Sequence, residues 1–485
     1  MNSIFSTPDS FALRGISLLA QAADAVMPMN AAQRRDLPAA CRDLSAMLTT
    51  ERGALSRSYW SSPRLTSAYL RYFLPWNIVR LTALLPSLPL GRMPDKPLVL
   101  DMGSGPFTLP IALWLSRPDL RRSPVTIVAS DTSPHILELG RSLFDFLRTQ
   151  LDAECPWVIR VMRSPAALAL RRLRARPGEL WLACMANVLN EMDERKLRPG
   201  QSVSARMRAL LEDAHAMLAE GGHLLSIEPG TRQGGRLVAH LRKSALGGEE
   251  DEELDDLTAF AAQEEKASVL PIQDDEDDDF DFALPPLFKP VLPCVHAEAC
   301  PMLGRGVSAW CHFNAPAPHA PDFLHSLSAR AGLDKDSVSL SFLLLKRAEG
   351  EMPPFRLKRG GAIPARVVSD AFAVPGLSRT ARYACTPAGL ALLPDALRIE
   401  QGELCRVKPA GERDRKSHAQ IMVPEQIVSS SREGVRRRSS ERTPGKISPR
   451  EPDGGYRHKA ARHEKAGERG SVRGDLFGDE KRRGR

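Results

Sequence analysis

The sequence lacks any apolar run that approaches the roughly 20 residues needed to cross a bilayer. We expect no secretory leader, because the N-terminal stretch SFALRGISLLAQAADAV is accompanied by Asp9 and Asp24 and by no cleavage signal. Both absences lead us to expect a cytoplasmic protein with no membrane partner. The sequence leaves the oligomeric state open.

Cysteine is scarce, with eight in 485 residues, yet three of the eight crowd into one stretch. Cys294, Cys300 and Cys311 lie within PCVHAEACPMLGRGVSAWCHF, beside His296 and His312. In the cytoplasm, cysteines serve more often as metal ligands or nucleophiles than as disulfides. Five residues separate the first two cysteines and ten separate the second from the third, unlike the short knuckles of common zinc sites. On spacing alone, an iron–sulfur cluster and a zinc site with a histidine ligand both stay open.

The formal net charge of +8 hides two opposite regions. Between Glu249 and Asp281, sixteen acidic residues stand against one lysine, whereas Arg406–Arg485 holds twenty-two basic and twelve acidic residues. The rest of the chain therefore carries a net charge of +13. A folded part this basic favours a polyanionic partner, and RNA is the leading candidate. The alternative is that the insert and the tail only solubilise and neutralise each other.

Apolar periodicity divides the chain into regions of different structure. From Leu98 onward, short apolar runs such as LVLDM, VTIVASD and LWLACMANVL alternate with amphipathic helices, which predicts a Rossmann-like α/β domain with a parallel sheet. We expect a helical N-terminal region at 1–90, the Rossmann domain at 91–246, an acidic disordered insert at 247–285, a cysteine-rich segment with the last sheet strand at 286–347, a small β-rich unit at 348–405 and a basic disordered tail at 406–485.

A glycine-rich turn follows the first predicted strand, in LVLDMGSGPFTLPIAL. Glycines there let the backbone turn sharply and approach a ligand, and the next helix offers free amides. The second strand ends in an aspartate that is placed to bind a ribose diol. Thr108 stands where a dinucleotide fingerprint wants a third glycine, which favours S-adenosylmethionine over a nicotinamide cofactor. The candidate cofactor-binding residues are Asp101, Gly103, Ser104, Gly105 and Asp131.

The loop MANVLNEM follows another strand at the same expected edge of the sheet. Asn187, Asn190 and Glu191 are the candidate catalytic residues, since methyl transfer needs in-line positioning more than acid–base chemistry. The alternative for this loop is helix capping. The Asn/Asp-Pro-Pro-aromatic motif of amino-group methyltransferases is missing, and Cys184 lies inside an apolar strand rather than in a nucleophilic pair.

The motifs MGSGPFTLP, NVLNE, EPGTRQGGRLVAHLR, PCVHAEACP, WCHF and RYACTPAG occur in this order. In this order they resemble the methyltransferase-like small-ribosomal-subunit proteins of the Rsm-twenty-two family. The resemblance runs from about Tyr59 to about Gly389, and excludes the acidic insert and the basic tail. It implies a class I S-adenosylmethionine-dependent methyltransferase fold that acts on, or escorts, the small-subunit ribosomal RNA during assembly or translation.

The resemblance also implies a 4Fe-4S cluster held by four cysteines. Its ligands fall on Cys294, Cys300, Cys311 and, across an interval of seventy-three residues, Cys385. Cys405 is the rival for the fourth position, and zinc is the alternative metal. For function, the alternative is a non-catalytic RNA-binding assembly factor with a vestigial cofactor pocket.

Overall fold

A computed structural model describes residues 3–49, 59–189, 203–248, 284–304, 307, 309–348, 361–374, 380–396, 398–414 and 417–425. All of these residues belong to one compact unit, Met1–Gln426. Almost all of the expected acidic insert and most of the expected basic tail lie outside the described residues. No helix within the described ranges is both long and apolar enough to span a bilayer.

The N-terminal region is helical, and its first and third α-helices begin at side-chain caps. Asp9 accepts a 2.7 Å hydrogen bond from the Ala12 amide at the start of the first helix, and Ser62 caps the third. A five-residue π-helical turn interrupts the run of the last two helices. The elements are α1 (Ser10–Val26), α2 (Ala31–Thr49), α3 (Pro63–Ala68), the π-helical turn η3 (Tyr69–Phe73) and α4 (Leu74–Leu84).

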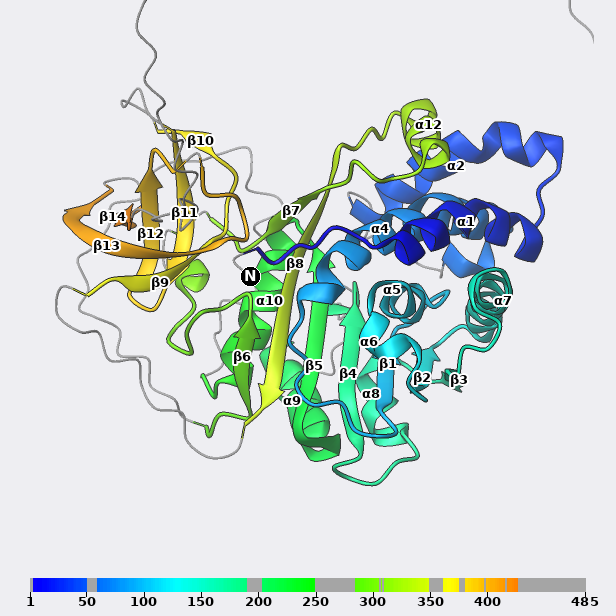
Figure 1. The fold of residues 1–485 in the computed structure, drawn as a ribbon, viewed down its shortest axis with the longest axis horizontal. Coiled ribbons are helices and arrows are strands. Elements are labelled where there is room, and N and C mark those ends of the chain that lie inside the picture. The colour runs from blue at the N-terminus through cyan, green and yellow to red at the C-terminus, as the bar shows by residue number, and fades with distance from the viewer. Residues whose placement is uncertain are drawn as a thin grey trace, which may run out of the picture. The chain divides into compact units, whose positions relative to one another are not determined.

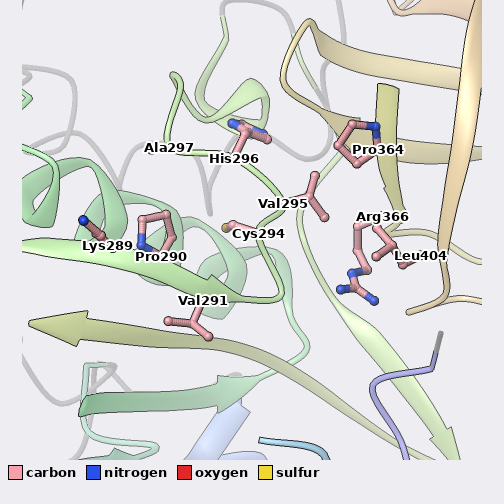
Figure 2. A pocket seen from close by; sticks show the side chains of 10 residues that line it. All are labelled: Lys289, Pro290, Val291, Cys294, Val295, His296, Ala297, Pro364, Arg366 and Leu404. Atoms are coloured by element: carbon pink, nitrogen blue, oxygen red, sulfur yellow. The ribbon is translucent and has the colours of Figure 1, made fainter. Parts of the chain in front are cut away.

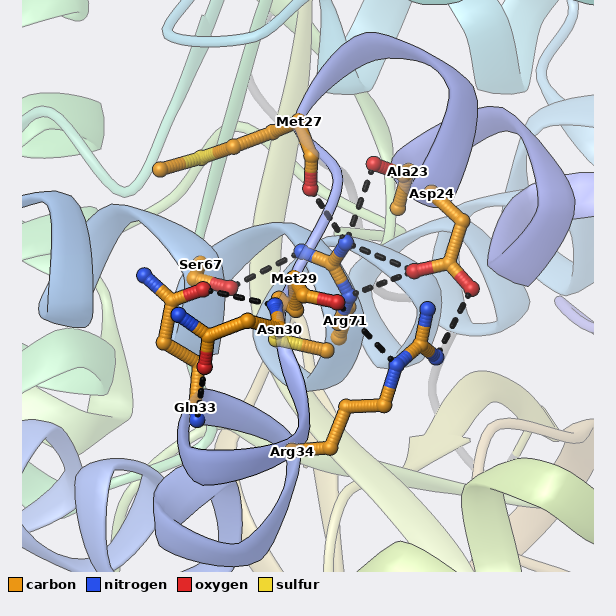
Figure 3. Close-up of polar contacts among 9 residues, drawn as sticks. All are labelled: Ala23, Asp24, Met27, Met29, Asn30, Gln33, Arg34, Ser67 and Arg71. Atoms are coloured by element: carbon orange, nitrogen blue, oxygen red, sulfur yellow. Dashed lines mark hydrogen bonds and ion pairs between the residues drawn. The ribbon is translucent and has the colours of Figure 1, made fainter.

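A buried arginine joins these helices to one another (Figure 3). The guanidinium of Arg71 in η3 donates to the carbonyls of Ala23 and Met27 at 3.1 and 2.6 Å, and to Asp24 at 2.7 Å. The last carbonyls of a helix have no partner inside the helix, so Arg71 satisfies the end of α1. Arg34 binds the other oxygen of Asp24 at 3.2 Å. The helical region is thus fixed to η3, which the functional site uses.

The central sheet has the strand order β3-β2-β1-β4-β5-β8-β6 (Figure 1). The first five strands are parallel, and β8 runs antiparallel to β5, so the sheet is mixed rather than wholly parallel as the periodicity predicted. The strands are β1 (Leu98–Met102), β2 (Thr126–Asp131), β3 (Val158–Arg163), β4 (Leu180–Ala186), β5 (Leu218–Pro229), β6 (Phe288–Leu292) and β8 (Ser337–Arg347).

Each face of the sheet has its own apolar core, because neighbouring residues of a strand point to opposite faces. Val99 joins the core shared with the N-terminal helices, whereas Leu100 joins the core on the other face. The helices between the strands are α5 (Thr108–Ser116), α6 (Pro118–Arg121) and α7 (Pro134–Leu151) on the first face, and α8 (Ala166–Arg172), α9 (Val203–Met217) and α10 (Arg232–Ala245) on the second. This two-sided covering is a doubly wound arrangement.

The cysteine-rich segment leaves the edge of the sheet and returns to it. Both β6 and β7 (Phe313–Pro316) pair with β8, at opposite ends of that strand. Residues 293–312 therefore form an excursion between two pieces of one edge, and we call them the edge excursion. Helix α12 (Asp322–Ala331) connects β7 to β8.

A second, smaller sheet closes on itself. Its order is β10-β11-β12-β14-β13-β9, and an additional pairing of β11 with β9 joins five of the strands into a small barrel. Its core contains Ile363, Leu393 and Val407. The strands are β9 (Ile363–Val367), β10 (Phe372–Ala373), β11 (Thr380–Thr386), β12 (Gly389–Pro394), β13 (Leu404–Arg413) and β14 (Gln420–Pro424).

The expected start of the disordered tail at residue 406 is wrong. Strands β13 and β14 carry the barrel on to Pro424. Val407 is buried while its neighbours Arg406 and Lys408 face outward, and ion pairs join both of them to Glu425. A strand with one face in water is rich in charge, so composition alone did not distinguish it from a basic tail.

Candidate functional site

The glycine-rich turn lies at the carboxyl end of β1, as the sequence predicted. Gly103 and Gly105 both have left-handed backbones, with φ of +71° and +53°. A Cβ added to Gly103 would lie 2.6 Å from a methyl carbon of Val188. Both the backbone conformation and the close approach therefore require glycine at 103. We call Gly103–Gly105 the glycine loop.

Two polar side chains beside the glycine loop are buried with unused hydrogen-bonding atoms. Asp101 and Ser104 are almost fully buried, and no hydrogen bond of normal geometry reaches Oδ2 of Asp101 or Oγ of Ser104 within the described part of the chain. Burial raises the pKa of Asp101 to about 7; the neighbouring Ser104 hydroxyl opposes this rise, and the charge of Asp131 adds to it. Buried polar atoms are normally satisfied, so these two fit a site that a polar ligand completes.

Asp131 ends β2 and reaches the glycine loop. Its two carboxylate oxygens accept hydrogen bonds from the backbone amides of Gly105, at 3.1 Å, and Ser133, at 3.0 Å. Burial raises the pKa of this carboxyl above its usual value. Asp131 and the glycine loop therefore meet at the carboxyl edge of neighbouring strands, where open α/β sheets bind ligands.

Asn187 is the first residue after β4 and lies at the same edge. Its backbone has a left-handed φ of +61°, its amide donates to the Ile227 carbonyl at 2.7 Å, and its Oδ1 accepts from Arg80 at 3.2 Å. Asparagine tolerates this backbone region better than most residues. The other two candidate catalytic residues, Asn190 and Glu191, lie outside the described residues.

The sequence prediction missed two buried charged residues, Arg80 and Glu228, near the loop that begins at Asn187. Arg80 in α4 donates to the Ser339 carbonyl and to Asn187, both at 3.2 Å. Glu228 in β5 is fully buried and accepts the Leu189 amide at 2.8 Å. Burial lowers the pKa of Arg80 to about 10. A charged residue inside an apolar run, as in NIVRLTALL and LLSIEPG, is the signal that would have found both.

The four predicted metal ligands come within electrostatic reach of one another from two parts of the fold, with Cys385 buried and the other three partly buried. Cys294, Cys300 and Cys311 come from the edge excursion, and Cys385 comes from β11 of the barrel. Burial, and then negative charge on the other three thiols, raises the pKa of Cys311 well above its usual value. His296 places Nε2 3.2 Å from the sulfur of Cys385. We call Cys294, Cys300, Cys311 and Cys385 the cysteine cluster.

Two arginines hold the backbone around the cysteine cluster. Arg242 of α10 donates to the carbonyls of His296, at 2.9 Å, and Glu298, at 2.7 Å. Arg366 of β9 donates to the carbonyl of Pro293 at 3.2 Å. Burial lowers the pKa of Arg242, but charges on nearby thiols outweigh this and raise it overall. The guanidinium and the thiols are thus within electrostatic reach of one another.

A pocket of about 530 Å³ opens beside the cysteine cluster. Its lining includes Cys294, His296, Lys289 and Arg366, which come from β6, the edge excursion and the barrel (Figure 2). One predicted ligand therefore borders a cavity instead of being sealed in the core.

The structure also bears on the expected metal and on Cys405, the rival fourth ligand. No group of three or more His, Cys, Asp or Glu side chains among the described residues is placed to hold a metal ion, so neither the expected iron–sulfur cluster nor the zinc alternative finds a ready site there. Cys405, the rival fourth ligand, lies in the barrel core with its sulfur 3.6 Å from the Ala365 carbonyl, and burial raises its pKa to about 11. Cys184 is buried within β4, as expected. His312 stacks on Trp310 at 4.7 Å.

No family model matches the chain. No curated protein matches it either. Among solved structures, it is similar to an S-adenosylmethionine-dependent methyltransferase from Aquifex aeolicus, at 16% identity over 29% of this chain and 59% of that chain, with a TM-score of 0.19. The match therefore spans less than two thirds of the Aquifex protein.

Two further solved structures are longer matches. One is an S-adenosylmethionine-dependent methyltransferase from Methanosarcina mazei, at 12% identity over 53% of this chain and 94% of that chain, with a TM-score of 0.25. The other is an arsenic(III) S-adenosylmethionine methyltransferase from Chlamydomonas reinhardtii, at 12% identity over 59% and 77%, with a TM-score of 0.24. These similarities identify no substrate, and the resemblance to the Rsm-twenty-two family stays a prediction.

The strand order and the glycine loop define the class of fold. Strands β3-β2-β1-β4-β5 follow the doubly wound order, and the loops that bind ligands in such sheets lie at their carboxyl ends. The chain therefore has a mixed, doubly wound α/β domain, and the glycine loop, Asp131 and Asn187 occupy its carboxyl edge.

Proposed function

We propose that the chain binds S-adenosylmethionine at the glycine loop and acts as a methyltransferase. The observation that carries this proposal is the pair of buried side-chain atoms of Asp101 and Ser104 without a normal hydrogen bond, on either side of Gly103, where there is no room for a side chain. Gly103 and Gly105 would let the cofactor approach the backbone, and Asp131 would accept hydrogen bonds from its ribose. When bound, the cofactor supplies an electrophilic methyl group.

The chain's own contribution to methyl transfer is positioning. Arg80 holds Oδ1 of Asn187, so the asparagine NH₂ group is turned away from the guanidinium and toward other acceptors. Glu228 holds the backbone at Leu189, which keeps the turn after β4 in place. The NH₂ group of an asparagine with a fixed orientation can donate to an acceptor atom of the substrate beside the atom to be methylated, and can so align the substrate for in-line displacement without removing a proton.

We propose RNA of the small ribosomal subunit as the partner, in the cytoplasm. The net charge of +13 outside the acidic insert and the tail supports a polyanionic partner. The order of motifs shared with the Rsm-twenty-two family supports this particular RNA. Binding of this kind weakens steeply as salt rises, because each phosphate contact releases a counterion.

We also propose that the cysteine cluster holds a 4Fe-4S cluster. Each cysteine of a 4Fe-4S cluster binds a different iron at a corner of the cubane, so the four sulfurs need not surround a single point. The ligands of a zinc ion would have to surround one point. Four thiolates and a cubane carry net negative charge, and two buried arginines, Arg242 and Arg366, lie in reach to offset it. A bound cluster supplies a rigid cross-link and a centre for electron transfer. Its ligands would join the edge excursion to β11.

Calorimetric titration with S-adenosylmethionine tests the first proposal. The wild-type protein should bind with a stoichiometry of about one, and Gly103→Ala should weaken binding at least about tenfold, because the new Cβ displaces Val188 and narrows the loop. Gly178→Ala is the matched control: its φ of +81° imposes similar backbone strain, and no atom lies within 4 Å of the added Cβ. Its affinity should not change.

A wild-type protein that binds no S-adenosylmethionine, with its metal content intact, would overturn the enzyme proposal. The non-catalytic assembly factor would then be the better function, since it needs the same basic surface but an inactive pocket. Equal losses in Gly103→Ala and Gly178→Ala would also count against a ligand at the glycine loop.

A further inference from the structure

Four aromatic rings gather beside the glycine loop. Tyr69 stacks on Phe73 with centroids 5.8 Å apart and on Tyr59 at 6.0 Å, and it meets Trp60 edge-on at 4.7 Å. Tyr59 and Trp60 are in contact with each other at 4.3 Å. We call Tyr59, Trp60, Tyr69 and Phe73 the aromatic face.

The aromatic face is only partly buried, although its elements belong to the core. Along η3 and α4, Tyr69, Phe73 and Asn77 keep partial exposure at a spacing of four residues, whereas Leu70 and Tyr72 between them are buried. One stripe of this helical run is therefore open to solvent and rich in aromatic surface. The π-helical turn that carries Tyr69 and Phe73 is a type of distortion that is frequent at functional sites.

The aromatic face extends from the glycine loop toward the end of β4. The Cζ2 atom of Trp60 lies 3.8 Å from the position that a Cβ on Gly105 would take. At the other end, Tyr69 is close enough to Arg80 to influence its pKa, and Arg80 binds Asn187. The rings thus span the distance between the glycine loop and the end of β4.

Two cations lie on or beside the helices that carry the aromatic face. Arg80 is buried in α4, and Lys335 lies over the rings of Tyr72 and Trp76, which are outside the aromatic face, with its nitrogen 5.3 and 5.7 Å from their centroids. Burial, together with the charge of Arg80, lowers the pKa of Lys335 to about 8. Aromatic surface next to positive charge suits a ligand that has both a flat ring and a phosphate.

We propose that the aromatic face is a stacking site for an unpaired nucleobase of the RNA substrate, which deepens the proposed function and rests on it. Single-stranded bases are recognised chiefly by stacking on Tyr, Trp and Phe rings. The residues that anchor the cofactor lie on β1 and β2, whereas the aromatic face runs toward Asn187 on β4, where the atom to be methylated must lie. A base held there would present its edge to Asn187.

A single-stranded RNA of roughly ten nucleotides with one central 2-aminopurine tests the proposal. Its fluorescence should be quenched on binding to the wild-type protein. Trp60→Leu, Tyr69→Leu and Phe73→Leu should each weaken binding roughly 5- to 100-fold and abolish the quenching, because leucine keeps apolar bulk but has no π face. Trp60→Phe should retain most of both signals.

The matched control is Tyr383→Leu, which removes a half-buried ring from the 4.7 Å pair with Phe372 in the barrel. Its affinity for the same RNA should not change. Thermal unfolding of each variant shows whether it is folded. A second measurement needs no substitution: an oligonucleotide with an abasic central position should bind the wild-type protein as weakly as the normal strand binds Trp60→Leu.

The outcomes separate this inference from the proposed function. If the leucine variants lose affinity for S-adenosylmethionine but not for RNA, the rings cover the cofactor and the stacking proposal is wrong. If the abasic and normal strands bind equally well, it is also wrong. If the wild-type protein binds no S-adenosylmethionine while the ring variants lose RNA binding, the stacking site stands and the methyltransferase proposal fails.

Discussion

Two regions of the molecule each bury an arginine, and they treat it in opposite ways. Arg80, behind the carboxyl edge of the sheet, has its pKa lowered to about 10, because burial outweighs the charges of Tyr69 and Glu228. Arg242, beneath the edge excursion, has its pKa raised, because the charges of nearby thiols outweigh burial. The first region has positive charge to spare for a ligand. In the second, the thiols favour the charged guanidinium as they ionise, although burial keeps their own pKa values high.

The hydrogen bonds of the two arginines follow the same division. Arg242 donates at 2.7 and 2.9 Å to two carbonyls of the edge excursion, whereas both bonds of Arg80 are 3.2 Å long. Short charge-assisted bonds to backbone are typical of a structural role. We infer that Arg242 holds the cysteine cluster together, and that Arg80 orients Asn187 and provides positive potential.

The largest expected effect follows from replacing one of the cysteine thiols near Arg242. Protein purified without oxygen should be brown, with about four irons per chain, and Cys385→Ser should lose the iron, because a serine oxygen is a poor ligand for a soft cluster. Cys405→Ser is the matched control, since Cys405 lies in the barrel core, and it should keep the iron. Iron analysis and the visible spectrum provide the measurement.

Two results would contradict that expectation. Colourless protein with one zinc per chain would replace the cluster by a zinc site. Loss of iron in Cys405→Ser alone would move the fourth ligand to Cys405 and require the barrel to rearrange.

The next effect compares the two arginines directly. Arg242→Met should lower the free energy of unfolding by about 2–6 kcal/mol, because it leaves the buried carbonyl of His296 and the partly buried carbonyl of Glu298 without this donor. Arg80→Met should change it by less than about 1 kcal/mol, since an apolar chain of similar length removes an ill-compensated charge. Urea unfolding of the two variants beside the wild type measures both values. Equal losses would show that the two arginines have the same structural role.

Local patterns account for what the sequence predicted. The strand, the glycine loop and the helix that follows are adjacent in LVLDMGSGPFTLPIAL, and Asp131 ends the next strand, so neighbouring residues were enough to place them. Asn187 followed from the same strand-end logic. The convergence of Cys385 with the edge excursion rested on the family resemblance, because no local pattern joins residues ninety positions apart.

What the sequence did not predict depends on distant partners. Arg80 sits between apolar residues of α4, and its role exists only because Asn187, 107 positions later, meets it. The edge excursion is recognisable only once β6 and β7 are both paired with β8, which follows them in the chain. Strand β13 was mistaken for a tail because its outward face is charged. In each case the missing information is tertiary.

The third expected effect, which depends on pH, concerns the carboxyl proton of Asp101 beside the glycine loop. The pKa of Asp101 is about 7 in the folded protein against 3.8 for an ordinary aspartate, mainly because the carboxyl is buried. Between those values the unfolded chain releases the proton and the folded chain keeps it. Stability is therefore lost as pH rises from about 4 to about 7, by as much as about 4 kcal/mol in total. Asp101→Asn cannot ionise, so its stability relative to the wild type should increase over that range and level off above it.

Urea unfolding at several pH values between about 5 and 8 measures this difference. Asp119→Asn is a control of opposite sign, because hydrogen bonding to Arg117 lowers the pKa of the Asp119 carboxyl. Its folded state favours the ionised form, so the loss caused by Asp119→Asn should be fully present throughout this range and constant. A difference for Asp101→Asn that does not vary with pH would mean that Asp101 is already ionised and paired. The charge of Asp101 would then be compensated by groups of the chain itself. The contrast between Arg80 and Arg242 would no longer support a ligand at the glycine loop.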